Sequence, residues 1–182
     1  MRAAKIIDSM LSFARKGGPD RQETNLAQLI EDTISLAQND YNLKKKTDFK
    51  NIEIVKQSNT DVPNIFCERT KIQQVVFNII KNASEAMFGD QDKSKPPKIV
   101  IRLSKQANMA CIQIEDNGPG IDSDTRKRVF EPFFTTKSVD KGTGLGLSVS
   151  YFIVVDNHGG KMEVESTMGE GTNFSIQLPF RA

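Results

Sequence analysis

The chain lacks most features that would assign it to a specialised class of protein. Its 182 residues carry a formal charge of only +2, so nothing suggests a nucleic-acid surface. The two cysteines, Cys67 and Cys111, form no CxxC pair and have no partnering histidines, so a buried free thiol is the default expectation for each. No apolar run is long enough to span a bilayer, and residues 1–5 lack a signal-peptide core. We therefore expect a cytoplasmic domain without direct membrane contact.

The N-terminal segment predicts a short helix that packs against other helices. Apolar residues recur there at heptad-like spacing: Ala3, Ile7, Met10 and Ala14. The strong breaker Gly17-Gly18-Pro19 follows. A helix this short is marginal by itself, so we interpret it as the tail of a helical bundle. This divides the chain into residues 1–18, the end of a bundle helix with its linker, and residues 19–182, one globular domain.

The remaining sequence predicts helices beside a sheet built largely from hairpins. Asn25 is a candidate helix cap, with Gln28 as its capping-box partner. Further helices are expected at 68–88, 123–129 and 145–156, and strands at 52–54, 62–66, 98–105, 109–116, 161–167 and 172–178. The expected class is α+β: a two-layer sandwich with a mixed, mainly antiparallel sheet and helices on one face, preceded by the short bundle-type helix.

A polar stripe borders the apolar arc of the helix expected at 68–88. Asn78, Asn82 and Glu85 lie on this stripe at helical spacing. In isolation, such residues are more typical of a solvated helix face. However, the edge of a buried helix is where a site would be built, and amide oxygens can hold a hydrated Mg²⁺ ion.

A carboxylate continues an apolar strand face. Period-two alternation places Ile112, Ile114 and Asp116 on the same side of their strand. The string Asp116-Asn-Gly-Pro-Gly120 alone is more typical of a β-turn. A carboxylate on an apolar face is nevertheless either badly placed or occupied by a ligand, and it can accept a hydrogen bond from an exocyclic amine such as that of adenine.

Two further glycine motifs stand near the C-terminus, Gly142-Thr-Gly-Leu-Gly-Leu147 and Gly169-Glu-Gly-Thr172. The first lacks the spacing and the preceding strand of a dinucleotide fingerprint, and no Gly-Lys-Ser/Thr follows it, which excludes a P-loop. It directly precedes an expected helix, whose N-terminal amides and dipole favour an anion such as triphosphate. The second is a hairpin turn when it is considered alone.

Taken in order, the four motifs resemble the N, G1, G2 and G3 boxes of the histidine kinase ATP-binding domain. This Bergerat fold is shared with gyrases, heat-shock chaperones and mismatch-repair ATPases. The resemblance covers roughly Asn25 to Pro179 and implies ATP and Mg²⁺ as cofactors. It implies the following nucleotide-binding residues: Asn78, Asn82, Asp116, Gly118, Gly120, Ile121, Phe133, Lys137, Gly142, Thr143, Gly144, Leu145, Gly146, Leu147 and Thr172.

The resemblance also implies individual roles. Asp116 accepts the adenine amine, and Asn82 holds Mg²⁺, with Glu85 as the next candidate for the metal. The catalytic residues are Asn78 and Lys137; Lys137 follows the aromatic F box at 130–134 and can meet the γ-phosphate, with Lys141 as a weaker alternative. Hydrolysing relatives carry a glutamate base at the position of Asn78, so hydrolysis should be poor. Residues 135–143 are expected to form a mobile lid that includes Lys137.

The implied function is donation of the γ-phosphate of MgATP to a histidine on a separate bundle, in two-component signal transduction. Its implied partners are its own phosphoacceptor and dimerisation bundle and a response regulator, and the parent is a homodimer that can be membrane-anchored. The only histidine, His158, precedes Gly159-Gly160, where we interpret it as a structural helix cap. Two alternatives stay open. A serine-kinase anti-sigma-type regulator would not carry the bundle-like helix, and a nucleotide-binding pseudokinase would usually have lost box residues.

Overall fold

The computed structural model describes residues 21–40, 49–58, 61–88, 95–137 and 142–180. The expected N-terminal helix, the linker that ends at residue 18, Lys141 and the middle of the expected lid lie outside the described residues. The domain boundary between residues 18 and 19 therefore stays a prediction.

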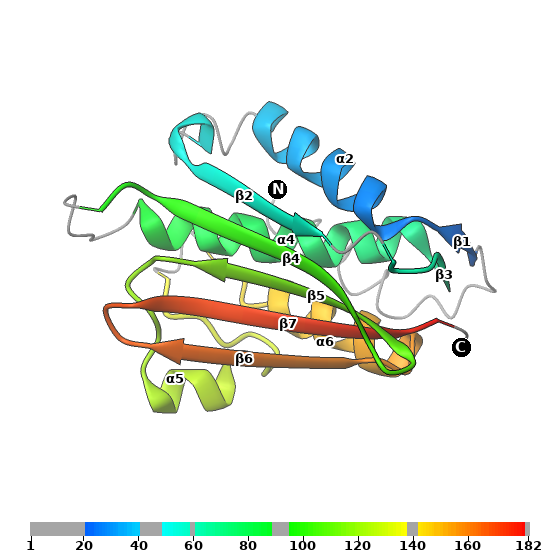
Figure 1. The fold of residues 1–182 in the computed structure, drawn as a ribbon. Coiled ribbons are helices and arrows are strands. Elements are labelled where there is room, and N and C mark those ends of the chain that lie inside the picture. Colours follow the sequence, from blue (N-terminus) through cyan, green and yellow to red (C-terminus); the bar gives the residue numbers. More distant parts are fainter. Residues whose placement is uncertain (1–20, 41–48, 59–60, 89–94, 138–141, 181–182) are drawn as a thin grey trace.

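One five-stranded sheet forms the first layer of the fold (Figure 1). Its strands run in the order β2 (Glu53–Ser58), β4 (Lys98–Gln106), β5 (Met109–Asp116), β7 (Gly171–Pro179) and β6 (Lys161–Thr167). The β2–β4 pair is parallel and the other three pairs are antiparallel. Both expected hairpins are present, and the sheet is mixed and mainly antiparallel, as predicted.

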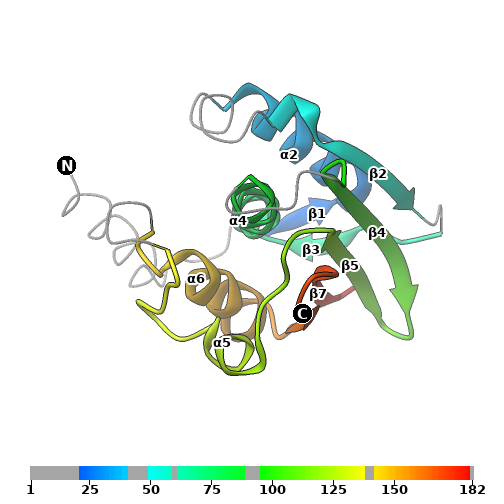
Figure 2. The ribbon, with the colours of Figure 1, turned by 90° about the vertical axis from the view of Figure 1, so that its left-hand side faces the viewer.

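The second layer consists of helices on one face of this sheet (Figure 2). They are α2 (Leu26–Asn39), the long central α4 (Arg69–Met87) and α6 (Gly146–Phe152), while the short α5 (Ser123–Arg128) contacts the edge strand β6. Alternation along the strands explains the layering, because Ile112 and Ile114 are buried against the helices whereas Gln113 faces the other side. The predicted α+β class is confirmed. Among the described residues, no helix is long and apolar enough to cross a membrane.

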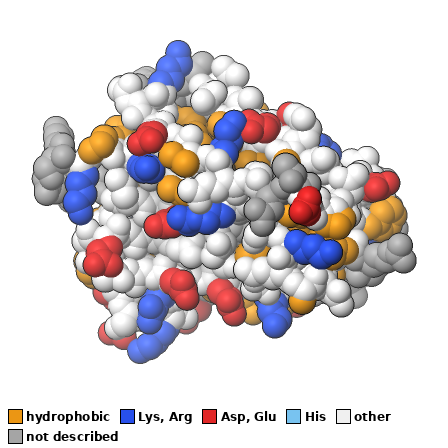
Figure 3. Space-filling model, viewed as in Figure 1, with side chains coloured by type: hydrophobic (Ala, Val, Ile, Leu, Met, Phe, Trp, Pro, Cys, Tyr) orange, Lys and Arg blue, Asp and Glu red, His pale blue; other side chains and the backbone are white. Residues whose placement is uncertain are grey.

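The outer face of the sheet carries side chains of both charges. Figure 3 shows Lys and Arg interspersed with Asp and Glu over this face. Arg102 on β4 pairs with Glu115 on β5 at 2.5 Å across the strands. A solvated, charge-balanced face opposite the helical layer places the core, and any deeply built site, on the helical side.

Helix α2 begins at the predicted cap, but the capping box is incomplete. The Asn25 side chain accepts a hydrogen bond from the Gln28 amide at 3.0 Å, as expected for an N-cap. The Gln28 side-chain nitrogen donates to Asp32 at 2.9 Å. The reciprocal bond of a capping box, from the Asn25 amide to the Gln28 side-chain oxygen, is not among the hydrogen bonds of the described residues.

Two elements depart from the sequence-based expectation. Strand β1 (Gln22–Thr24) pairs with β3 (Ile65–Cys67) in a separate two-stranded sheet. The helix expected at 145–156 changes at Ile153 into a π-helix, Ile153–Asn157. Both cysteines are free and buried, as predicted.

Candidate functional site

Asp116 lies at the end of the central strand β5, on the face that carries the helices. Its side chain is only 6% exposed, and its strand neighbours in register are Ile99 and Thr172. Burial raises the pKa of Asp116 from 3.8 to about 6, although hydrogen bonds from the backbone amides of Gly118 and Thr172 favour the charged form. A buried carboxylate with a raised pKa at a sheet end is a functional-site candidate.

The loop after Asp116 packs directly on the β6–β7 turn. Gly120 has a φ of +72°, and a Cβ there would lie 2.2 Å from the carbonyl oxygen of Thr167, so only glycine fits. The amide of Gly169 donates to the carbonyl of Pro119 at 2.7 Å. The predicted G1 and G3 motifs, about 50 residues apart in the chain, therefore form one wall.

Ser166 holds this wall together and was not predicted from the sequence. Its hydroxyl accepts from the Ile121 amide at 2.9 Å, donates to the Gly171 carbonyl at 2.7 Å and lies 3.1 Å from the Thr172 hydroxyl. A serine on an edge strand belongs to no motif. Only the strand register indicates its role, because Ser166 pairs with Thr172 and Thr172 pairs with Asp116.

The helix stripe and the second glycine motif also meet. The Asn78 side-chain nitrogen donates to the Gly146 carbonyl and to the Ser150 hydroxyl, both at 3.3 Å. Asn78 therefore ties α4 to the start of α6. Ser150, fully buried and also bonded to the Gly146 carbonyl, is a second supporting residue that sequence motifs do not reveal.

Lys137 reaches the same stripe from the segment after the F box. Its ammonium donates to the side-chain oxygen of Asn82 at 3.1 Å and to the carboxylate of Glu85 at 2.5 Å. The structure thus brings together three residues that the sequence analysis connected with the metal and the phosphates, and it pairs the lysine with the helix.

Phe133 and the second glycine motif are joined through their backbones. The Phe133 amide donates to the Gly144 carbonyl at 3.0 Å. Gly144 has a φ of +67°, and a Cβ there would lie 2.4 Å from the Phe133 carbonyl carbon. Phe133 itself has a φ of +65°, which is rare for a bulky residue and typical of functional sites. Its side chain is 56% exposed, so the described contact is made by the backbone.

The leucines of the glycine motif face the core. Leu145 is buried and Leu147 packs against the core. The Thr143 hydroxyl accepts from the Leu145 amide at 3.4 Å, and a Cβ on Gly142 would lie 2.7 Å from the Thr135 hydroxyl. A ligand at this loop would therefore meet its backbone and its threonine, with the leucine side chains anchoring it from behind.

His158 is enclosed and bonded through both ring nitrogens. Its Nε2 accepts from the Glu68 amide at 3.1 Å, and its Nδ1 lies 2.7 Å from the Ile153 carbonyl. Nδ1 must therefore carry the proton, and burial lowers the pKa of His158 below 6.5, so the ring is neutral. His158 stands at the C-terminal end of the π-helix, as expected of a cap, but it links that end to the start of α4 as an uncharged ring.

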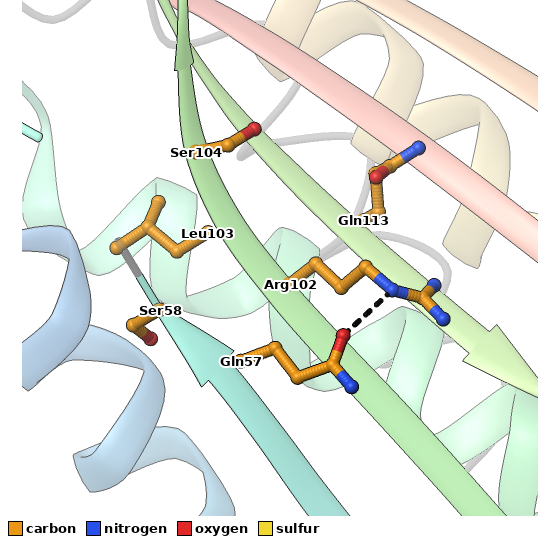
Figure 4. Close-up of a pocket in the computed structure, with 6 residues that line it drawn as sticks. All are labelled: Gln57, Ser58, Arg102, Leu103, Ser104 and Gln113. Carbon is orange, nitrogen blue, oxygen red and sulfur yellow. Dashed lines mark hydrogen bonds between the residues drawn. The ribbon is translucent and has the colours of Figure 1, made fainter.

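A hollow of about 280 Å³ lies on the outer face of the sheet, away from the four motifs. Figure 4 shows its lining residues, Gln57, Ser58, Arg102, Leu103, Ser104 and Gln113. Arg102 is already bonded to Gln57 at 3.0 Å and to Glu115 at 2.5 Å. We place the functional site at the motifs, because the buried Asp116 lies there beside the close-packed loops of the G1 and G3 motifs.

Comparison with known proteins shows the family of this domain. The family model described as histidine kinase-, DNA gyrase B-, and HSP90-like ATPase matches residues 67–182. Sporulation kinase E of Bacillus subtilis (strain 168) is 37% identical over 180 residues, which cover 99% of this chain and 22% of that protein. The histidine-protein kinase AtoS of Escherichia coli (strain K12) is 35% identical over 176 residues, which cover 96% of this chain and 26% of that protein. The chain thus spans about a quarter of these relatives.

Solved structures show the same fold. The nucleotide-free catalytic domain of histidine kinase ThkA superposes with a TM-score of 0.73 at 30% identity, covering 90% of this chain and 100% of that one. ThkA in complex with the response regulator protein TrrA gives a TM-score of 0.74 at 27% identity, covering 98% and 47%. The fold and the family match together define an ATPase domain. The chain belongs to the histidine kinase-, DNA gyrase B- and HSP90-like ATPase family, as a catalytic domain of the sensor histidine kinase type.

Proposed function

We propose that this chain binds MgATP and donates the γ-phosphate to a histidine on a separate helical bundle, as part of two-component signalling. The observation that carries the proposal is Asp116, a buried carboxylate at the end of β5 that lies against the loops of the G1 and G3 motifs. In the whole protein, residues 1–18 would end the dimerisation helix, and the partners would be that bundle and a response regulator.

Asp116 would select the base. Its carboxylate can accept the exocyclic amine of adenine, whereas guanine presents a carbonyl oxygen at the corresponding position. Gly118, Gly120 and Ile121 would border the purine, because this loop is held against the β6–β7 turn. Thr172, in register with Asp116, supports the carboxylate from β7.

The phosphate end would be formed by the loop from Gly142 to Gly146 and by Asn78, which ties this loop to α4. Lys137 can neutralise phosphate charge. The side-chain oxygen of Asn82 suits Mg²⁺, a hard cation that takes oxygen ligands. Bound there, the metal would supply further charge neutralisation for phosphoryl transfer.

The reaction is an in-line displacement. An imidazole nitrogen of the acceptor attacks the γ-phosphorus, a nitrogen–phosphorus bond forms, and the bond to the β,γ-bridging oxygen breaks so that ADP leaves. This chain positions the nucleotide and stabilises its charge. Radiolabelled ATP, supplied with and without a histidine-bearing bundle, tests the proposal: label should appear on the bundle.

Replacing Asn82 with alanine should remove most of the metal dependence of ATP binding. Without this amide oxygen, the ratio of the ATP affinity in Mg²⁺ to that in EDTA should fall about tenfold or more. Isothermal titration calorimetry measures both affinities. Asn39→Ala is the matched control, because Asn39 is exposed on α2 and bonds only its own helix among the contacts described. If Asn82→Ala keeps the wild-type ratio, the metal binds to ligands other than Asn82.

Affinity for adenine nucleotides should rise with pH through about 6. Because burial raises the pKa of Asp116 to about 6, the carboxylate is mostly protonated at pH 5 and mostly ionised at pH 7. If the ionised form accepts the adenine amine, ADP affinity should increase about tenfold over this range. Protonation of the nucleotide itself affects wild type and Asp116→Asn equally. The variant lacks the carboxylate, so its ADP affinity should change less with pH. Parallel pH profiles for both proteins would contradict the role.

The stability of the nucleotide-free domain should change with pH in the opposite sense. The folded pKa of Asp116 lies above its ordinary value of 3.8, so the folded state binds the proton more tightly than the unfolded state. Its contribution to unfolding free energy is therefore greatest below pH 4 and declines by about 3 kcal/mol up to pH 6. Urea titrations of wild type and Asp116→Asn give this difference. If the free energy of unfolding of Asp116→Asn declines equally over this pH range, other groups cause the decline.

A further inference from the structure

Asn82, Glu85 and Lys137 form a compact cluster in which one ammonium contacts a side-chain oxygen of each of the other two residues. We propose that Asn82 and Glu85 form a cation site which Lys137 fills in the nucleotide-free protein, and that Mg²⁺ displaces Lys137 when the nucleotide binds. The inference rests on the proposed function, and it adds Glu85 to the metal site and makes the position of Lys137 depend on the metal.

The cluster has the geometry of a shared cation site. Asn82 and Glu85 are three residues apart on α4, so their side chains lie on one face. One ammonium contacts an oxygen of each, at 3.1 Å and 2.5 Å. The Glu85 side chain is 21% exposed and that of Lys137 is 33% exposed, so the carboxylate is largely removed from water and needs a positive partner.

The backbone of Lys137 is held in place, whereas its long side chain can change direction. Its amide donates to the Thr135 hydroxyl at 3.1 Å, and a Cβ on Gly142 would lie 3.2 Å from the Lys137 Cβ. The base of the side chain therefore lies beside the glycine loop that would border the phosphates. A flexible four-carbon stem lets the ammonium leave Glu85 while staying next to that loop.

Mg²⁺ and the ammonium cannot share the same oxygens. Mg²⁺ binds oxygen ligands at about 2.0–2.1 Å, so a metal on Asn82 takes the lone pairs that Lys137 now uses and repels its charge. Glu85 retains a positive partner in either state, directly or through metal-bound water. The Lys137 ammonium would therefore become available to the phosphates only after Mg²⁺ has bound.

The test is metal binding without nucleotide, where the two cations compete directly. Electron paramagnetic resonance of Mn²⁺, an oxygen-seeking stand-in for Mg²⁺, reports the bound fraction. Lys137→Met should bind Mn²⁺ at least about fivefold more tightly than wild type, the lower end of typical coupling between two binding events. Adding Glu85→Gln to Lys137→Met should abolish the gain. Lys127→Met, which removes an exposed lysine paired with Asp124, controls for net charge.

The outcomes separate this inference from the proposed function. If Lys137→Met and Lys127→Met bind Mn²⁺ alike, while wild type binds ADP in EDTA, the cation exchange is wrong and the nucleotide site stands. If wild type binds no ADP with or without Mg²⁺, the proposed function fails. Thermal unfolding verifies that each variant is folded, and Lys137→Gln replaces Lys137→Met if the latter is not; equal Mn²⁺ affinity in that variant and wild type would likewise overturn the exchange.

Discussion

Replacing Asp116 with alanine is expected to weaken ATP binding about 10- to 150-fold, because a hydrogen bond to a charged group contributes about 1.5–3 kcal/mol. The buried position of Asp116 strengthens this expectation, since an adenine amine left without an acceptor there would lose its water as well. Calorimetry with ATP on wild type and variant measures the change. Glu115→Ala is the matched control, because Glu115 is the adjacent carboxylate and pairs with Arg102 on the outer face of the sheet.

The same experiment with GTP tests base selection. Wild type should prefer ATP, and the preference should shrink in Asp116→Ala. Equal affinities of wild type for ATP and GTP, or an alanine variant that binds ATP like wild type, would show that Asp116 does not recognise the base. Urea denaturation of the variant shows whether the change in affinity is separate from any change in folding.

The second large effect is a phosphotransfer that needs an added acceptor. With radiolabelled ATP alone, the chain should neither label itself nor hydrolyse ATP quickly. Asn78 has an amide where a general base would need a carboxylate, and its nitrogen is already bonded to Gly146 and Ser150. His158, the only histidine, is buried and bonded at both ring nitrogens. Label should appear once a histidine-bearing bundle of a sensor histidine kinase is supplied.

Transfer in trans should be weak, because tethering normally supplies an effective concentration of about millimolar. A bundle whose acceptor histidine is replaced by alanine is the control. Label on His158 of the lone chain, or ATP turnover as fast as that of the hydrolysing relatives, would refute the kinase hypothesis. Label on a serine of an added protein would favour the anti-sigma-type kinase, and ATP binding without any transfer would favour the pseudokinase.

Local patterns predicted the secondary structure that carries the site. The alternation of Ile112, Ile114 and Asp116 correctly placed the carboxylate on the buried face of β5, because strand periodicity depends only on neighbouring residues. Likewise, the apolar arc of α4 and the Asn25 cap were readable from a few residues each. The order of the motifs then predicted which loops should meet.

Contacts between distant segments were not predictable in the same way. Ser166 acts through cross-strand register, and the β1–β3 pair joins segments about 40 residues apart, so neither leaves a local pattern. The π-helix begins at Ile153, whose carbonyl bonds His158, and the other ring nitrogen of His158 bonds the distant Glu68 amide. Lys137 was assigned to the phosphates, whereas its pairing with Glu85 depends on how the segment after the F box packs on α4.

The most direct test of the central claim is a titration of the chain with MgADP, in which nuclear magnetic resonance monitors the signal of each backbone amide. The four motifs are predicted to form one site, so the largest shifts should fall on Asn82, Asp116 to Ile121, Gly142 to Gly146 and Gly171-Thr172. Gln57, Arg102 and Gln113, around the hollow on the outer face, should be little affected. Shifts centred on that hollow, or no shifts at the motifs at saturating MgADP, would contradict the account.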